Sequence, residues 1–110
     1  DKTFNLRIFP DSSGRFNLSA VDVQAELLIV SQFTLYAGTR RGRRPDFMRA
    51  APPNVAWPLF EQVVKLAEMG PLKVVTGRFQ AHIVVEIHND GPVSIWIDSE
   101  ERQHPRRAHL

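Results

Sequence analysis

The sequence contains no cysteine, and this absence removes several kinds of chemistry at once. Disulfides, thiolate metal sites and cysteine nucleophiles are all excluded. No apolar run approaches the roughly 20 residues that a membrane-spanning helix requires. Glycine-rich phosphate loops of the dinucleotide-binding and P-loop types are also missing. We therefore expect a cytoplasmic protein with no membrane segment, no bound metal and no cofactor.

The composition that remains is typical of one soluble globular domain. The chain has 110 residues, of which 43% are hydrophobic and 24% are charged. These values leave little room for a second domain and argue against disorder along the whole chain.

Arginine is distributed unevenly along the chain, although the formal net charge is only +2. One cluster comprises Arg40, Arg41, Arg43, Arg44 and Arg49, and a second lies near the end at Arg102, Arg106 and Arg107. Guanidinium groups pair bidentately with phosphate, so the first cluster is a candidate contact for a nucleic-acid backbone. A solvated loop that aids solubility is the alternative interpretation of the same cluster.

The clearest periodic segment predicts a helix over residues 54–69. Asn54 is suited to cap it, Pro58 falls in or just after its first turn, and Gly70-Pro71 ends it. Two sets of apolar residues recur at helical spacing and together make a wide apolar face. These sets are Val55, Leu59, Val63, Leu66 and Ala56, Phe60, Val64, Ala67.

The other apolar segments are short and predict strands. They cover residues 6–9, 15–19, 26–35, 72–75, 81–88 and 93–97, separated by turns at 10–14, 76–79 and 89–92 and by a long loop at 36–53. Because strands do not alternate regularly with helices, we predict an α+β fold with a mostly antiparallel sheet and one main helix. Residues 1–99 would form this domain, and residues 100–110 a mobile tail rich in arginine and histidine.

Candidate catalytic groups are sparse. The strand predicted over 26–35 becomes polar at its tip, as expected where a strand opens onto a pocket or a sheet edge. Ser31, His82 and Asp90 allow a triad on paper, but Ser31 is not flanked by the glycines of a nucleophile elbow. The carboxylates of Asp98, Glu100 and Glu101 are expected to be solvated.

Two segments resemble the signature motifs of one enzyme family. They are Ser31-Gln32-Phe33-Thr34-Leu35 and Asn89-Asp90-Gly91-Pro92-Val93-Ser94, and they are similar to the motifs of the D-aminoacyl-tRNA deacylases. Further segments match that family in the same order and spacing: 5–9, 42–47, 50–53 and 76–79. The resemblance covers essentially residues 1–99, and it implies the deacylase fold with a barrel-like core.

The resemblance implies an activity and partners. Members of this family are homodimers that hydrolyse the ester joining a D-amino acid to the terminal ribose of a tRNA. They also act on glycine mischarged on tRNA-Ala. This chain would thus be a hydrolase that binds tRNA and proofreads chirality in translation. Two alternatives stay open: a non-catalytic RNA-binding or dimerisation module of the same fold, and a related deacylase with altered stereochemical preference.

The resemblance also implies roles for individual residues. Ser31, Gln32, Phe33 and Thr34 would form the catalytic segment, with backbone N–H groups near Gln32 and Phe33 facing the substrate carbonyl and the tRNA 2′-hydroxyl assisting. Gly91 and Pro92 would be a Gly-cis-Pro element that reaches into the partner subunit's pocket and excludes L side chains. The pocket for the terminal adenosine would include Phe79 and Ile83. The loop of Arg40, Arg41, Arg43 and Arg44 would contact the acceptor stem, an inference made from charge.

The sequence departs from the family pattern at a few positions. Gly38 replaces a polar residue, Gln80 replaces a small residue, Ile83 replaces methionine and Ser94 replaces threonine. Gln80 is the departure expected to affect substrate fit, since it would crowd the adenosine site. Family members also have an N-terminal portion of strands and a helix before residues 5–9. The resemblance therefore implies an N-terminally incomplete domain.

Overall fold

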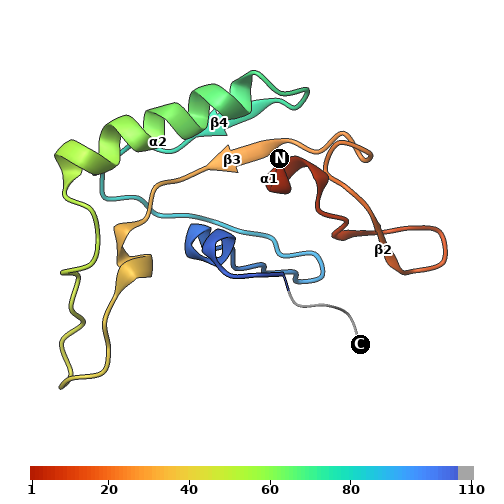
Figure 1. Cartoon of the computed structure of the whole chain (residues 1–110). Helices are drawn as coiled ribbons and strands as arrows, with labels where there is room; N and C mark the ends of the chain where they lie inside the picture. The colour runs from red at the N-terminus through yellow and green to blue at the C-terminus, as the bar shows by residue number, and fades with distance from the viewer. Residues whose placement is uncertain (107–110) are drawn as a thin grey trace.

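The structure, a computed structural model, describes residues 1–106. Figure 1 shows its main layer: the long helix α2 (Pro53–Glu68) lies along the parallel strands β3 (Leu27–Ile29) and β4 (Val74–Thr76). On the N-terminal side, the short helix α1 (Lys2–Asn5) leads into an antiparallel pair, β1 (Phe9–Pro10) and β2 (Phe16–Leu18). Two 3-10 helices complete the set, η1 (Phe33–Tyr36) and η2 (Ser99–Gln103).

The predicted main helix is confirmed, with its start one residue earlier. Pro52, not Asn54, occupies the N-cap position, and no side chain caps the first turn. Pro53 begins the helix, where proline's missing N–H is of no consequence. Pro58 lies inside the helix, just after its first turn, as predicted.

Only one of the two apolar sets on α2 packs against the rest of the chain. Ala56, Phe60, Val64 and Ala67 are half-buried, and α2 contacts β4. The second set, Val55, Leu59, Val63 and Leu66, is exposed. The wide apolar face is therefore divided into a face toward the sheet and an exposed stripe.

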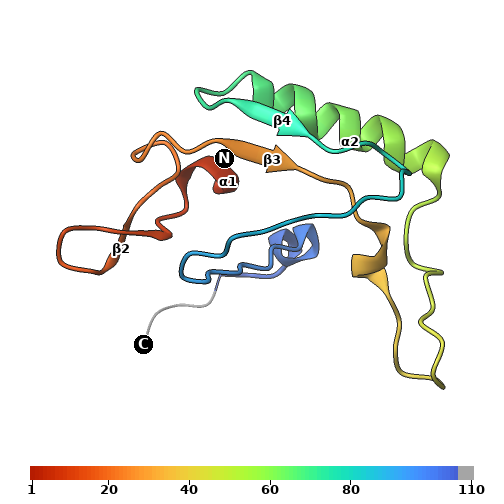
Figure 2. The ribbon, with the colours of Figure 1, turned by 180° about the vertical axis from the view of Figure 1, so that it is seen from behind.

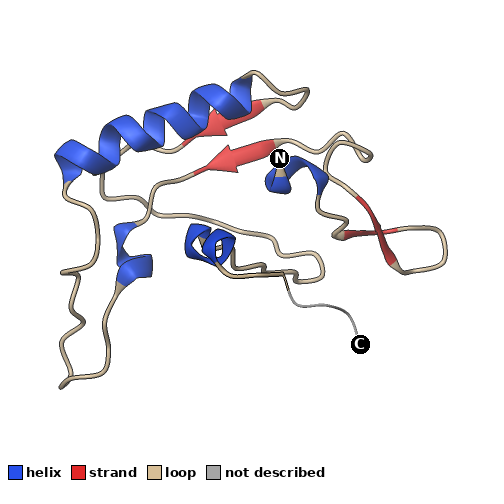
Figure 3. Cartoon of the chain, in the orientation of Figure 1, coloured by secondary structure: helices blue, strands red, loops and turns tan. Residues whose placement is uncertain are grey.

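The sheet prediction is correct only in part. The β1–β2 pair is antiparallel, but the β3–β4 pair is parallel, because α2 crosses over between its two strands. Residues 81–88 and 93–97, predicted as strands, form no ladder with any described residue and run as irregular chain (Figure 3). A strand is defined by hydrogen bonds to a neighbour, and alternating apolar residues alone do not supply that neighbour.

The described residues have almost no fully buried core. Ala20 and Leu72 are the buried hydrophobic residues, and Ser19 is the buried polar one. Many large apolar side chains are exposed instead, among them Val84 at 82% and Ile87 at 69%. The barrel-like core that the resemblance implies is thus not closed within residues 1–106. Exposed apolar area of this kind is typical of surfaces that bind other protein segments.

The C-terminal segment begins with more order than the sequence predicted. Ser99–Gln103 form η2, whose N-cap Asp98 accepts a hydrogen bond from the Glu100 N–H at 3.0 Å. The predicted tail therefore starts inside a short helix. Its last part, 107–110, lies outside the described residues.

A reciprocal pair of hydrogen bonds fixes the turn after β2. The buried Ser19 N–H donates to Asp22 Oδ2 at 2.8 Å, and the Asp22 N–H donates to Ser19 Oγ at 3.1 Å. The backbone of Ser19, then its side chain, hold the pKa of the Asp22 carboxyl below its ordinary value. The ionised form is thus the one that stabilises the fold.

This pair predicts a pH-dependent contribution to stability. Because the pKa is lowered on folding, the stabilisation is present above about pH 4, the unfolded value, and is lost as pH falls through the folded value. We expect Asp22→Asn to lower the melting temperature at pH 6 and to approach the wild type at pH 3. Asp90→Asn, at an exposed turn, is the control and should show no such convergence. Equal destabilisation by Asp22→Asn at both pH values would contradict the assignment.

Candidate active site

The two parallel strands bring the first signature motif and Phe79 to one edge of the sheet. Ile29 is paired with Thr76, and the Gly77 N–H donates to the Ile29 carbonyl at 3.1 Å. Because both strands run in the same direction, the segments that follow them emerge on the same side. Ser31–Thr34 follows β3 there, and residues 77–79 follow β4 (Figures 1 and 2).

The segment Ser31–Thr34 turns into η1 instead of continuing the predicted strand. Ser31 is half-buried, whereas the other three residues are exposed, Phe33 at 60%. The Gln32 amide donates to the Thr34 hydroxyl, so these two side chains bond to each other. Phe33 makes an edge contact with Phe47, with ring centroids 5.1 Å apart. Phe47 therefore anchors the long loop to this segment.

The backbone N–H groups of Gln32 and Phe33 are available to a ligand. Neither of them donates a hydrogen bond to another residue of the described chain. Two unengaged donors next to each other on exposed backbone are the kind of group that can stabilise an oxyanion. No hydrogen bond joins Ser31, His82 or Asp90 within residues 1–106, so the triad that the sequence permits is not assembled there.

Phe79 lies in an aromatic cluster on α2. Its ring centroid is 4.9 Å from that of Trp57 and 6.0 Å from that of Phe60. Ile83 lies near the same sheet edge, because Gly77 is close to both Ile83 and Val30. A Cβ added to Gly77 would lie 3.4 Å from Val30 Cγ2 and 3.6 Å from Ile83 Cδ1. The structure thus brings both predicted adenosine-pocket residues close to the sheet edge that holds the first motif.

Gln80 has a strained backbone conformation. Its φ angle is +57°, in the left-handed region that favours glycine. The departure from a small residue, recognised in the sequence, therefore has a backbone consequence in addition to any crowding.

We expect Gln80→Gly to stabilise the protein by about 0.5–1 kcal/mol. Relief of the left-handed conformation at about 1–2 kcal/mol outweighs the extra chain entropy of glycine. Thermal unfolding followed by circular dichroism measures the effect. Gln62→Gly within α2 is the matched control and should destabilise by about 1 kcal/mol. If both variants are destabilised alike, the strain at Gln80 is refuted.

The second motif lies far in space from the first motif of the same subunit. The Gly91–Pro92 peptide bond is cis, and Gly91 has a φ angle of +136°. A Cβ on Gly91 would lie 3.2 Å from the Val93 nitrogen and 3.3 Å from Val93 Cγ2, so an added side chain would be crowded as well as strained by this φ angle. The turn that holds this bond lies at the far end of segment 81–97 from η1, in both views (Figures 1 and 2).

The loop after η1 presents four arginines to solvent. Backbone hydrogen bonds of 2.6 and 2.8 Å join Gly38 and Asp46 and close residues 39–45 into a loop, which we call the arginine loop. Arg40, Arg41, Arg43 and Arg44 are all exposed, and none forms an ion pair within the described chain.

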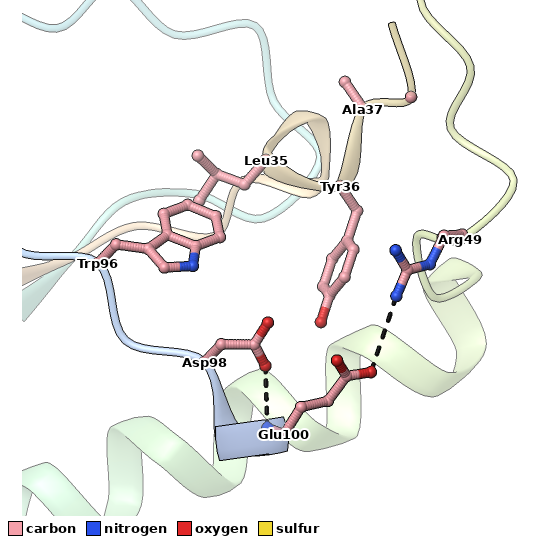
Figure 4. A pocket seen from close by; sticks show the side chains of 8 residues that line it. Leu35, Tyr36, Ala37, Arg49, Trp96, Asp98 and Glu100 are labelled. Carbon is pink, nitrogen blue, oxygen red and sulfur yellow. Dashed lines mark hydrogen bonds and ion pairs between the residues drawn. The ribbon is translucent and has the colours of Figure 1, made fainter. Parts of the chain in front are cut away.

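Arg49 does not belong to the arginine loop, although the sequence groups it there. It pairs with Glu100 at 3.7 Å, and its guanidinium carbon lies 5.6 Å from the Tyr36 ring centroid. These residues, with Trp96 and Asp98, line a cleft between η1 and η2 (Figure 4). The sequence does not reveal this cleft, because its two walls, Leu35–Gly38 and Trp96–Glu100, come from segments that lie far apart in the chain.

The described residues contain no cluster of three or more histidine or carboxylate side chains that could hold a metal ion. No helix among residues 1–106 is long and apolar enough to cross a membrane.

Comparison with known proteins confirms the family resemblance found in the sequence. The family model described as D-Tyr-tRNA(Tyr) deacylase matches residues 1–98. The chain belongs to the D-aminoacyl-tRNA deacylase family. Members of this family are ester hydrolases that act in tRNA proofreading.

Individual relatives show the same relation. A D-aminoacyl-tRNA deacylase from Roseiflexus sp. (strain RS-1) is 54% identical over 110 residues, covering 99% of this chain and 70% of the relative. One from Dehalococcoides mccartyi (strain ATCC BAA-2266 / KCTC 15142 / 195) is 51% identical over 106 residues, covering 96% and 69%.

A solved structure shares the fold. It is the c-Myc DNA Unwinding Element Binding Protein, with a TM-score of 0.73 and 39% identity, covering 84% of this chain. The match spans 63% of that chain. The deacylase fold is thus shown by both sequence and structure, even though few of its strands form ladders within residues 1–106.

Proposed function

We propose that this chain is the catalytic part of a D-aminoacyl-tRNA deacylase. The reaction is hydrolysis of the ester between a D-amino acid and the terminal ribose of tRNA, including glycine mischarged on tRNA-Ala. The observation that carries the proposal is the family match over residues 1–98, together with identities above 50% to curated deacylases across nearly the whole chain.

The proposed chemistry needs no side-chain nucleophile. Water adds to the ester carbonyl, the carbonyl oxygen becomes an oxyanion, and the bond to the ribose oxygen then breaks. The proton lost by water passes to that ribose oxygen, with the tRNA 2′-hydroxyl assisting. The unengaged N–H groups of Gln32 and Phe33 are suited to bind the oxyanion, and fixed donors of this kind contribute more to catalysis than to ground-state binding.

The side chains of the first motif then hold those donors in place. The Gln32–Thr34 hydrogen bond and the Phe33–Phe47 contact both restrict the start of η1. Ser31, half-buried at the end of β3, would form the floor of the pocket. Phe79 and Ile83 would form its wall for the terminal adenosine, with Trp57 and Phe60 supporting the Phe79 ring.

Selectivity in this proposal comes from a second copy of the chain. The turn at residues 89–92 lies far from η1 in its own subunit (Figures 1 and 2), so Gly91-Pro92 would act in the partner's pocket within a homodimer. Its carbonyl groups would bind the substrate amino group and leave no space for an L side chain. Rejection of this kind depends on a clash and not on a fitted contact.

The arginine loop is the proposed contact for the tRNA backbone. It continues directly from η1, so a tRNA whose 3′ end occupies the site would bring its acceptor stem near these guanidinium groups. We assign residues 1–99 to the deacylase domain and 100–110 to a C-terminal tail that begins within η2. We place the activity in the cytoplasm.

A deacylation assay with matched substrates tests the function. We expect D-tyrosyl-tRNA to lose its amino acid at least about 100-fold faster than L-tyrosyl-tRNA, measured as kcat/KM. Uncharged-tRNA binding by filter retention serves as a parallel measurement. Binding of tRNA without hydrolysis of either substrate would refute the enzyme hypothesis in favour of a non-catalytic RNA-binding module. Equal hydrolysis of both substrates would refute chiral proofreading.

A further inference from the structure

The cleft between η1 and η2 is not used by the proposed chemistry. It encloses about 230 Å³, below the roughly 300–1,000 Å³ of sites for drug-sized ligands, so it suits a single ring system. Its aromatic walls are accessible: Trp96 is 65% exposed and Tyr36 is 46% exposed. Figure 4 shows Trp96, Tyr36 and Asp98 arranged around a common space.

The polar groups of the cleft favour a hydrogen-bond donor. Glu100 is paired with Arg49, which leaves Asp98 as the carboxylate without a cationic partner among residues 1–106. Its Oδ1 accepts the Glu100 N–H, and its second oxygen has no partner in the described chain. Because Arg49 offsets Glu100, Asp98 leaves the lining with one unpaired negative charge, which disfavours a phosphate. An amino group on a planar ring would be bound by the free oxygen of Asp98.

We propose that this cleft binds one unstacked nucleobase of the RNA substrate that carries an exocyclic amino group. The base would stack on the Trp96 indole and donate its amino hydrogens to Asp98. Stacking on aromatic side chains and hydrogen bonds to base edges are the usual means of reading single-stranded RNA. The inference rests on the proposed function, because it names a further contact to the same RNA.

The position of the cleft fits this role. Leu35 and Tyr36 line it and belong to η1, the element that begins with the catalytic segment. At about 2 Å per residue, the length of η1 is about 8 Å, so the cleft lies near the proposed pocket for the terminal nucleotide. The arginine loop begins immediately after the cleft, where it would meet the phosphates of the same strand.

The experiment compares two single-stranded RNAs of equal length and charge, UUCCU and UUUUU, labelled with fluorescein at the 5′ end, and only the first contains bases with an exocyclic amino group. Fluorescence anisotropy with the whole chain measures the two dissociation constants. We expect UUCCU to bind about tenfold more tightly, because cytosine presents an amino donor where uracil presents a carbonyl acceptor. Asp98→Asn should bring the ratio close to one, since an amide can both donate and accept.

A second pair of variants separates stacking from folding. Trp96→Leu should weaken both RNAs by about tenfold or more. Phe16→Leu, at an aromatic residue on β2 that is 58% exposed, should change neither constant. Equal affinity for the two RNAs, or an unchanged ratio in Asp98→Asn, would overturn the proposal. These RNAs carry no ester, so failure of the cleft assignment is distinct from failure of the deacylation assay.

Discussion

Replacing Gly91 with alanine is expected to lower kcat/KM for D-tyrosyl-tRNA by on the order of 100-fold and to reduce the preference for D over L substrates. The backbone at Gly91 has a φ angle of +136°, which L residues rarely adopt, and an added Cβ would meet the Val93 nitrogen at 3.2 Å. The turn must therefore shift. A displacement of about 1 Å in a positioning element can cost this much activity.

Gly14→Ala is the matched control for this prediction. Gly14 also has a positive φ angle, +83°, but a Cβ there would meet no atom within 4 Å. It should reduce thermal stability without changing the D to L ratio. A Gly91→Ala protein that stays folded and keeps the wild-type ratio would contradict the role of this turn. Pro92→Ala offers a second test of the same element without adding a Cβ at Gly91.

Neutralising the arginine loop is expected to weaken tRNA binding by on the order of 100-fold at low salt. The variant changes Arg40, Arg41, Arg43 and Arg44 to glutamine. Each guanidinium that neutralises a phosphate releases counterions, so binding depends steeply on salt. If all four contact the backbone, the slope of log K against log salt should fall by about 3 to 4. Titrations at several salt concentrations measure both quantities.

A variant with the same change in net charge controls for long-range electrostatics. Lys2, Arg15, Lys65 and Lys73 are exposed cations outside the loop, and changing them to glutamine removes the same number of charges. This control should retain most of the affinity and most of the salt slope. If the two variants lose affinity equally, the loop has no specific role and the interaction depends on net charge alone.

The exposed apolar surface bears on how the protein is assembled. Within residues 1–106, one stripe of α2 and most of segment 81–97 present apolar side chains to solvent. Soluble monomers rarely expose large contiguous apolar patches, so such faces are typical of interfaces. The proposed homodimer would cover part of this surface, and it would also bring Gly91-Pro92 of one subunit to η1 of the other.

Much of the local structure was determined by the sequence itself. The apolar spacing over 54–69 fixed the main helix, and the Pro-Asp-Ser-Ser-Gly turn placed β1 and β2 as an antiparallel pair. These features depend on residues close in the chain, whose backbone preferences act without distant partners. The two signature motifs are also contiguous, so the family could be recognised from sequence.

Only the tertiary structure shows the strand pairing, side-chain contacts and cleft that join segments distant in the chain. The alternating residues 81–88 predicted a strand, but no described neighbour supplies a ladder. The strand β3 instead pairs in parallel with β4 through the α2 crossover. Arg49 is not part of the arginine loop, because its side chain contacts Glu100 and Tyr36 instead. The Trp96 cleft exists only because η1 and η2 meet. Such contacts join residues whose separation in the chain carries no local signal, so only the fold could bring them together.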